Sequence, residues 1–472
     1  MTSTLETIHD ASLAILKNTG MIFHAPEAVD ILHKKGCIVE GNRVFFPENV
    51  LMDLISSAPE SFTLFARNPA FSIEIGTGTP TYSVGYGCPS IIERDGTKRN
   101  ANFDDYLNFV KLIQGIDNLR INGGIPAQPN DIDMETCSLL MVATALLYSD
   151  KCIMAQPGSR QQVEEMFNLA ALTSGGMTQM RKEPRIITLI NTLTPLQMDA
   201  HAVDTLMVHA ENGQPIVICS GFMQGTTAPM TMAGSMALGN AETLAGVALT
   251  QAIRPGTPVV MAINGSPANM RTGALDIGSP AHAIEVKCCA ALSKKYGIPC
   301  RCGGTSTDAK SVTAQAGYEA MMTMQTSMES GVDLIIHSAG ILNSYAAMSY
   351  EKFMLDLEII SKLEYIAAGI PINDKTLALG VIDTVGPGGQ YLTHMHTMEN
   401  CRIEPWQSPI ESLVKQESNE GDNDFLIRNL KANVDKRIAA YERPVLPEET
   451  VTYIKNFLRE KGVPEQDIKR LN

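Results

Sequence analysis

The sequence predicts an α/β protein: a (β/α)8 TIM barrel with an N-terminal α+β cap and a C-terminal helical extension. Two observations predict the barrel. Between residues 79 and 369, eight short apolar segments alternate with eight longer amphipathic segments, which is the order of strands and helices in such a barrel. Glycines also end several of the amphipathic segments just before the next apolar one, as helix stops commonly do: Gly213, Gly256, Gly297 and Gly331.

The cap is predicted over residues 1–78. Apolar residues from Leu5 to Ile15 recur at helical spacing with acidic residues among them, so we expect an amphipathic helix and not a signal peptide. Residues 37–46 have the pattern of a hairpin that turns at Gly-Asn. Two further helices are expected at 25–35 and 47–57, and two short strands at 61–67 and 71–75.

The barrel is predicted over residues 79–369, with a hairpin-like insertion at 91–99 after its first strand. The predicted strands are 82–87, 119–123, 151–155, 185–190, 215–220, 258–263, 299–303 and 332–337. The predicted helices that follow them are 104–116, 134–149, 160–174, 197–212, 233–253, 280–296, 312–330 and 350–367. Residues 370–472 form the extension, with a glycine-rich loop at 383–396 and charged amphipathic helices at 424–441 and 447–461.

The composition argues against several classes of protein. A net charge of −14 argues against a nucleic-acid partner, because phosphates bind basic surfaces; it fits a cationic ligand, although solubility is the simpler explanation. No apolar run reaches the roughly 18 residues of a membrane span. The ten cysteines are not spaced as a disulfide framework, which indicates a cytoplasmic protein. Cys300 and Cys302 lack further ligands nearby, so we expect core cysteines and no metal site.

In a barrel, the chemistry gathers where strands end and helices begin. The residues at the predicted ends are mostly amides, hydroxyls and aromatic rings, with one carboxylate and one histidine. A hydrolase or an aldolase would place a carboxylate pair, a Schiff-base lysine or a metal cluster there. A neutral, aromatic-lined mouth instead suits a compact cation, because ring faces attract it. The candidates are Tyr86, Gln156, Asn191, Phe222, Asn264, Asp308, His337, Asn343 and Tyr345.

Simpler structural explanations exist for these candidates. Tyr86 and Phe222 could be packing residues of the barrel mouth. Asp308 could cap the helix that follows it, and His337 could be a buried histidine with satisfied hydrogen bonds. The residue types alone leave these alternatives open.

Four stretches resemble the trimethylamine methyltransferase superfamily: residues 44–69, 306–322, 349–360, and 386–402 with Trp406. The founding members of that superfamily use pyrrolysine to demethylate trimethylamine, whereas this chain contains only the twenty standard residues. The resemblance therefore implies the non-pyrrolysine branch. Members of that branch demethylate quaternary amines such as glycine betaine, proline betaine or carnitine. They pass the methyl group to the cobalt of a corrinoid (cobalamin) that a separate small carrier protein supplies, so no tightly bound cofactor is expected.

The strand-end candidates receive roles under this implied reaction. Asp308 and His337 are expected to be catalytic, and Arg301 would meet a substrate carboxylate if its side chain pointed inward. The substrate is expected to contact Tyr86, Gln156, Asn191, Phe222, Asn264, Asn343 and Tyr345. The corrinoid is expected to contact Gly303, Gly304, Gly388, Gly389 and His394, with the glycine-rich turn folded over the barrel mouth.

Two other functions remain open at this point. The chain could be a metal-independent barrel lyase or decarboxylase, which would act without a corrinoid protein. It could also be a non-catalytic betaine-binding protein, which would leave the methyl count of its ligand unchanged. The sequence does not identify the quaternary amine, since pocket shape decides among such similar ligands. The additional terminal elements lead us to expect a homo-oligomer.

Overall fold

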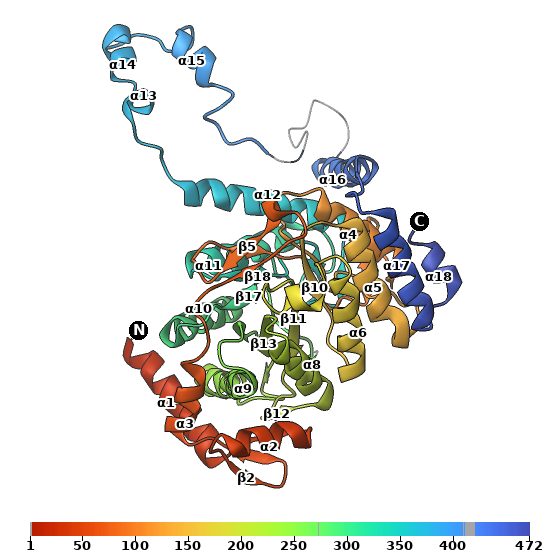
Figure 1. The fold of residues 1–472 in the computed structure, drawn as a ribbon. Helices are drawn as coiled ribbons and strands as arrows, with labels where there is room; N and C mark the ends of the chain where they lie inside the picture. The colour runs from red at the N-terminus through yellow and green to blue at the C-terminus, as the bar shows by residue number, and fades with distance from the viewer. Residues whose placement is uncertain (1, 272, 409, 411–420) are drawn as a thin grey trace.

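The computed structural model of the protein (Figure 1) describes residues 2–271, 273–408, 410 and 421–472. Five parallel strands pair in the order β15-β13-β11-β10-β9, and three pair as β17-β18-β6. Backbone bridges from Tyr82 to Leu119 and from Met261 to Cys300 join the two sheets at both seams. The eight strands therefore close in chain order, and the predicted (β/α)8 barrel is confirmed. The strands are β6 (Thr81–Tyr82), β9 (Ile121–Gly123), β10 (Cys152–Ala155), β11 (Ile186–Asn191), β13 (Ile216–Ser220), β15 (Val259–Ile263), β17 (Arg301–Gly303) and β18 (Leu334–Ile336).

Both faces of these strands are covered, which explains their nearly continuous apolar sequences. In β13, Val217 and Cys219 face the interior of the barrel, here called the lumen, while Ile216 and Ile218 pack toward the surrounding helices. The helices that follow the strands are α4 (Phe103–Gln114), α5 (Met134–Tyr148), α6 (Arg160–Ala171), α8 (Ala200–Glu211), α9 (Met232–Ile253), α10 (Pro280–Tyr296), α11 (Ala314–Glu329) and α12 (Tyr350–Ala368). Side-chain caps fix several of their starts, as at Asn102 before α4 and Ser159 before α6.

The first part of the chain lies against α9 (Figure 1). It contains α1 (Thr2–Asn18), α2 (Pro26–Lys34), α3 (Glu48–Ile55), β1 (Met21–Phe23) and the predicted hairpin of β2 (Ile38–Glu40) with β3 (Arg43–Phe45). Strand β1 also pairs with β12 (Gln197–Met198), which belongs to the loop after β11. The start of the chain therefore supports one side of the barrel from outside.

The next hairpin closes one end of the lumen. Strands β4 (Phe62–Leu64) and β5 (Ile73–Ile75) pair antiparallel, and their side chains Leu64, Ile73 and Ile75 pack with the lumen-facing residues of the barrel. The backbone N–H of Phe65 donates to the carbonyl of Pro184, which precedes β11. The hairpin thus occupies the N-terminal ends of the strands and leaves the C-terminal ends for a ligand.

A small sheet stands beside those C-terminal ends. The predicted insertion forms the hairpin β7 (Ser90–Ile92) and β8 (Lys98–Asn100), which pairs with β20 (Ala347–Met348) and, through it, β19 (Ile341–Leu342). The turn from β19 to β20 holds Asn343, Ser344 and Tyr345 at positive φ, between 51° and 70°. Non-glycine residues rarely adopt this conformation, and three in succession fix the direction of the turn toward the strand ends.

The remaining elements are η1 (Pro69–Phe71), α7 (Met177–Met180), β14 (Met223–Gln224), β16 (Ser266–Pro267), α13 (Asp374–Leu377), α14 (Leu379–Val385), α15 (Met395–Asn400), α16 (Asp422–Ala439), α17 (Glu448–Glu460) and α18 (Glu465–Lys469). Helix α16 packs on α12, and α17 packs on α5. No helix of the described residues is long and apolar enough to cross a membrane. The division of the chain after residues 78 and 369 stays a prediction.

Residues 370–403, here called the arm, project from the end of α12 away from the barrel (Figure 1). Among the described residues, every hydrogen bond of the arm has both its donor and its acceptor in the arm or in a residue directly adjoining it. The chain rejoins the body where Trp406 Nε1 donates to Ser361 Oγ at 3.1 Å. The glycine-rich turn from Gly386 therefore does not fold over the mouth of its own barrel, which corrects our expectation.

Candidate active site

The C-terminal ends of the strands form the mouth of the lumen. Four exposed residues form a rim: Gly87, Pro157 and Gly221, which follow β6, β10 and β13, and Asn191, which ends β11. Tyr86, Asn264 and Tyr345 are half-buried at the mouth, and His337 and Arg301 lie deeper, being 6% and 2% exposed. An open rim above a buried polar floor is the usual form of a small-molecule site in a barrel.

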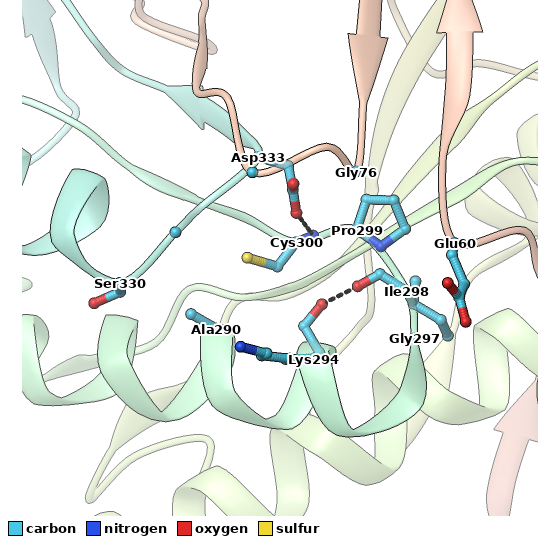
Figure 2. Close-up of a pocket in the computed structure, with 13 residues that line it drawn as sticks. Glu60, Gly76, Ala290, Lys294, Gly297, Ile298, Pro299, Cys300, Ser330 and Asp333 are labelled. Carbon is cyan, nitrogen blue, oxygen red and sulfur yellow. Dashed lines mark hydrogen bonds between the residues drawn. The ribbon is translucent and has the colours of Figure 1, made fainter. Parts of the chain in front are cut away.

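A separate cavity of about 380 Å³ lies at the other end of the barrel (Figure 2). It is lined by residues that precede β17 and β18, including Pro299 and Asp333. The carboxylate of Asp333 accepts a hydrogen bond from the Cys300 N–H at 2.9 Å, and burial raises its pKa. Asp333 thereby fixes the start of a strand. The cavity lies at the N-terminal ends of β17 and β18, whereas barrel enzymes place their chemistry at the C-terminal ends.

Three aromatic residues lie at the mouth, Tyr86, His337 and Tyr345, and the rings of His337 and Tyr345 are in contact. The centroids of the His337 and Tyr345 rings are 4.5 Å apart, with planes tilted by 37°. The backbone N–H of Tyr86 donates to His337 Nδ1 at 3.2 Å, and the Tyr86 hydroxyl donates to the Ala155 carbonyl at 3.4 Å. Since ring faces attract cations, this aromatic cluster is suited to an ammonium group.

His337 is held as a neutral ring. Its φ is 62°, in the left-handed region that few non-glycine residues adopt and that often marks functional sites. Because Nδ1 accepts the Tyr86 N–H, that nitrogen carries no proton, and the neutral ring has its proton on Nε2. Burial and the positive charge of Arg301 lower the pKa of His337 well below its usual value. A neutral imidazole does not repel a substrate cation.

Arg301 lies at the first position of β17 and points into the lumen. Its Nη1 donates weakly to Cys219 Sγ at 3.9 Å, and its Nε has no hydrogen-bond partner among the described residues. Burial raises the pKa of the Tyr86 and Tyr345 hydroxyls, and the Arg301 charge opposes that rise. The guanidinium therefore acts electrostatically on the aromatic cluster above it.

Two side-chain carbonyls at the mouth also lack partners. Gln156 Nε2 donates to the Gly124 carbonyl at 2.6 Å, but Gln156 Oε1 accepts nothing from the described residues. Asn264 Nδ2 is 3.4 Å from the Tyr345 hydroxyl, and Asn264 Oδ1 is likewise unpaired. A buried acceptor without a donor is costly, so these oxygens indicate a ligand or ordered water.

His282 and Ser306 extend this polar region beneath Gly303. His282 Nδ1 donates to the Gly265 carbonyl at 3.1 Å, and His282 Nε2 and Ser306 Oγ are buried without partners among the described residues. A Cβ added at Gly303 would lie 3.0 Å from Ser306 Oγ and 3.5 Å from His282 Nε2. Gly303 therefore gives these groups room to converge.

Two carboxylates near the mouth are held by protein donors, the buried Glu242 and the half-buried Asp308. Glu242 accepts hydrogen bonds from the hydroxyls of Thr192, Thr194 and Ser220 and from the Leu196 N–H. Asp308 accepts hydrogen bonds from the backbone N–H groups of Ile277 and Gly278 and from the Ser344 hydroxyl. These contacts order three loops around the mouth, so the geometry of Asp308 favours a positioning role over the catalytic role that we expected.

Three other predicted substrate residues lie at the rim or outside the mouth. Phe222 is fully buried against α9, where a Cβ added at Gly239 would lie 2.9 Å from its ring. Asn191 belongs to the exposed rim. Asn343 supports the β19–β20 turn, since its backbone N–H donates to the Ala309 carbonyl at 2.8 Å. Of the predicted substrate residues, the structure brings Tyr86, Gln156, Asn264 and Tyr345 together with His337.

The predicted corrinoid contacts fall into two groups. Gly303 and Gly304 are buried at the end of β17, and a Cβ added at Gly304 would lie 2.8 Å from the Ser338 Cα. Their lack of a side chain thus serves backbone packing beneath the mouth. Gly388, Gly389 and His394 lie on the arm, away from the mouth of the same chain.

Sequence reasoning did not select His282 and Ser306, and it left the direction of Arg301 open. His282 is a helical residue, so inspection of strand ends does not find it. Ser306 follows the predicted end of β17 within a polar loop and was a detectable candidate. The sequence does not show which residues of the short strand β17 point into the lumen. The neighbours of Arg301, Cys300 and Cys302, are both apolar enough to lie on either face of the strand.

A closed parallel barrel whose open mouth lies above a buried polar floor is the architecture of a barrel enzyme that binds a small molecule. Within that class the chain matches the family model described as "Trimethylamine methyltransferase (MTTB)" over residues 2–464. The chain belongs to this trimethylamine methyltransferase family.

Two relatives match nearly the whole chain. A glycine betaine methyltransferase of Desulfitobacterium hafniense (strain Y51) is 36% identical over 458 residues, which cover 97% of this chain and 96% of the relative. A proline betaine:corrinoid methyltransferase of Eubacterium limosum is 31% identical over 475 residues, with the same coverage of 97% and 96%. The crystal structure of the Methanosarcina barkeri monomethylamine methyltransferase is similar with a TM-score of 0.53 at 12% identity, covering 92% of this chain and 87% of that one. This last likeness supports the fold alone.

Proposed function

We propose that the protein transfers a methyl group from a quaternary amine to the cobalt of a corrinoid that a separate carrier protein supplies. The observation that carries the proposal is the neutral aromatic cluster of Tyr86, His337 and Tyr345 at the mouth. Its rings suit a quaternary ammonium, and the family and the two betaine methyltransferases among its relatives support the reaction.

The chemistry asks little acid–base work of the chain. When the C–N bond breaks, its electron pair stays on nitrogen, and the leaving group is a neutral tertiary amine that needs no proton. Cobalt(I) of the partner's corrinoid is the methyl acceptor and the nucleophile. The chain's part is to hold the ammonium, orient one methyl group outward and exclude water.

The exposed rim suits the approach of a large planar ring. Gly87 and Gly221 have no side chains, and Pro157 is compact, so a corrinoid face can come close to the mouth. Among the described residues, no three His, Cys, Asp or Glu side chains are placed to hold a metal ion. In this proposal the corrinoid is a substrate that arrives with its carrier. We also propose a cytoplasmic location, supported by ten free cysteines.

The test mixes the purified protein with chemically reduced cob(I)alamin and a panel of quaternary amines and follows the visible spectrum. We expect one of them to convert cob(I)alamin to methylcobalamin, with release of its demethylated amine. The assay is repeated with the cognate carrier protein. No methyl transfer in either format would overturn the proposal, and consumption of the amine without a corrinoid would favour a lyase.

We further propose that the arm docks on a second copy of this chain. Its apolar side chains are exposed, as at Ile370 (85%), Ile372 (77%) and Leu392 (72%), and its hydrogen bonds stay local. Exposed apolar patches of this kind mark interaction sites. A second copy is the partner that would also bring Gly388 and His394 near a barrel mouth, as their predicted corrinoid contacts require.

Light scattering tests this arrangement. The wild type is expected to form an oligomer that the triple change Ile370→Ser, Ile372→Ser and Leu392→Ser dissociates. Val445→Ser is the control, since Val445 is also exposed (93%) but lies outside the arm. A monomeric wild type, or an oligomer unchanged in the triple variant, would refute the arm's role.

A further inference from the structure

We infer that the corrinoid carrier protein docks on one side of the mouth, against an apolar patch formed by Leu193, Met230 and Met270. This inference rests on the proposed function and assigns the surface that its protein partner contacts. The three side chains, here called the rim patch, are 48%, 58% and 67% exposed. Clustered apolar side chains that stay open to solvent mark interaction sites.

The rim patch lies on the loops that follow β11, β13 and β15, three neighbouring strands of the barrel. Strands β14 and β16 pair with each other and join the second loop to the third. A Cβ added at Gly225 would lie 2.8 Å from Met230 Sδ and 3.4 Å from Met270 Sδ, so both methionines lie against the same glycine. A Cβ added at Gly221 would lie 3.7 Å from Asn191 Oδ1, which brings the first loop to the second at the rim. The patch is therefore continuous with the rim of the mouth.

The backbone beneath the rim patch is held by local hydrogen bonds. The Met223 N–H donates to Thr227 Oγ1 at 2.8 Å in the loop after β13. The Asn269 N–H donates to the Ala274 carbonyl at 2.9 Å in the loop after β15. The loops thus present their methionines before a partner arrives, which lowers the cost of binding, and the unbranched side chains can adapt to the partner's surface.

The charges around the mouth distinguish this side from the opposite one. Residues 191–198 and 221–235 contain no charged side chain, although the net charge of the chain is −14. The loops after β6 and β9 instead expose charged side chains, as at Arg94, Asp95 and Asp133. The side of the mouth that carries the rim patch is therefore suited to apolar contact, and the other side is suited to water.

The closed end of the lumen indicates which molecule covers the rim patch. Because the β4–β5 hairpin packs into the N-terminal ends of the strands, the proposed methyl transfer requires the cobalt to come to the mouth. The protein that carries the corrinoid must then contact the loops around the mouth. A patch of three side chains is small, and small interfaces suit a partner that leaves after each transfer.

Kinetics with two methyl acceptors test this assignment. The double change Met230→Ser with Met270→Ser should raise the KM for the carrier protein about tenfold, as expected for two contacting interface residues. Its rate with free cob(I)alamin should equal that of the wild type, because free cob(I)alamin brings no protein surface. Met134→Ser is the control: Met134 is 86% exposed at the start of α5 but stands alone between Asp133 and Glu135. It should leave both reactions unchanged.

Several outcomes would overturn the rim patch as the docking surface. One is an unchanged KM for the carrier in the double variant. A second is an equal loss with free cob(I)alamin, which would place the effect inside the mouth. A third is an equal effect of Met134→Ser. Light scattering supplies the last: a wild-type oligomer that the double variant dissociates would mean that a second copy covers the patch.

A binding measurement separates this inference from the proposed reaction. Calorimetry titrates the carrier protein of the transfer assay, loaded with cob(II)alamin, into the wild type and into the double variant. Binding about tenfold weaker in the double variant, without methyl transfer by the wild type, would leave the docking surface standing and reject the reaction. Equal binding by the two proteins would overturn the docking surface, whether or not methyl transfer occurs.

Discussion

Gly265 shows at the scale of one residue how tightly the mouth is packed. A Cβ added there would lie 2.0 Å from Cε2 of the buried Phe222 ring. Gly265→Ala is therefore expected to destabilise the protein by about 1–3 kcal/mol, because overpacking forces the ring and the loop apart. Gly317→Ala in α11 is the matched control: it meets nothing within 4 Å and should stabilise by about 0.5–1 kcal/mol. Urea unfolding measures both changes, and equal effects would contradict the packing argument.

His209 makes stability depend on pH. It is fully buried, its Nδ1 donates to the Pro215 carbonyl at 2.8 Å, and burial lowers its pKa from 6.5 to about 3. As the pH falls below 6.5, the unfolded chain therefore takes up a proton that the folded chain does not. This one group should lower the free energy of unfolding by about 2 kcal/mol as the pH falls from 7 to 5.

The check compares the pH 7 to pH 5 loss in the wild type with that in His209→Gln, by urea unfolding. The variant's loss should be smaller, whatever its stability at pH 7. His24→Gln serves as the control, because His24 is exposed. An identical loss in His209→Gln and the wild type would refute the assignment.

At the scale of elements, α12 is joined to the barrel by a buried ion pair. Lys352 and Asp356 are both fully buried and paired; Lys352 Nζ also donates to the Thr305 carbonyl, and Asp356 accepts the Gly340 N–H at 2.8 Å. Lys352→Met would leave the Asp356 charge unpaired and should cost about 3–5 kcal/mol. The double change Lys352→Met with Asp356→Leu should cost less.

An exposed ion pair on the same helix serves as the comparison. Lys362 pairs with Glu358 at the same spacing but is 45% exposed, so Lys362→Met should cost under about 1 kcal/mol. Thermal unfolding ranks the variants. A double variant less stable than Lys352→Met alone would mean that Asp356 acts mainly through Gly340 and not through the ion pair.

The sequence predicted the elements better than it predicted the directions of side chains. Apolar strands and helix stops identify all eight barrel strands, because both faces of a parallel strand are buried and the pattern is unambiguous. Because both faces of each strand are buried, the sequence does not show which residues face the lumen. Phe222 packs outward on α9, while Arg301 points inward. Alternation of polar and apolar residues would reveal this parity, and a strand as short as β17 does not show it.

The site was therefore predictable in part. The structure places Tyr86, His337 and Tyr345 at the mouth, as expected for residues that follow strand ends. His282 was missed because it comes from a helix, and the role of Asp308 depends on loops whose course the sequence does not determine. The course of the arm was predicted wrongly, because local sequence patterns do not determine where a long connecting segment folds.

At the scale of the whole molecule, the β4–β5 hairpin closes one end of the lumen and leaves the mouth as its opening. Leu64, Ile73 and Ile75 close the lumen at the N-terminal ends of the strands. In the proposed reaction the amine therefore enters and leaves by the mouth, where the carrier protein also docks. Turnover must then be ordered: amine first, carrier second, and demethylated amine released only after the carrier has gone. Excess carrier protein should slow steady-state turnover by covering the mouth before the amine has bound. Raising the amine concentration should relieve this inhibition.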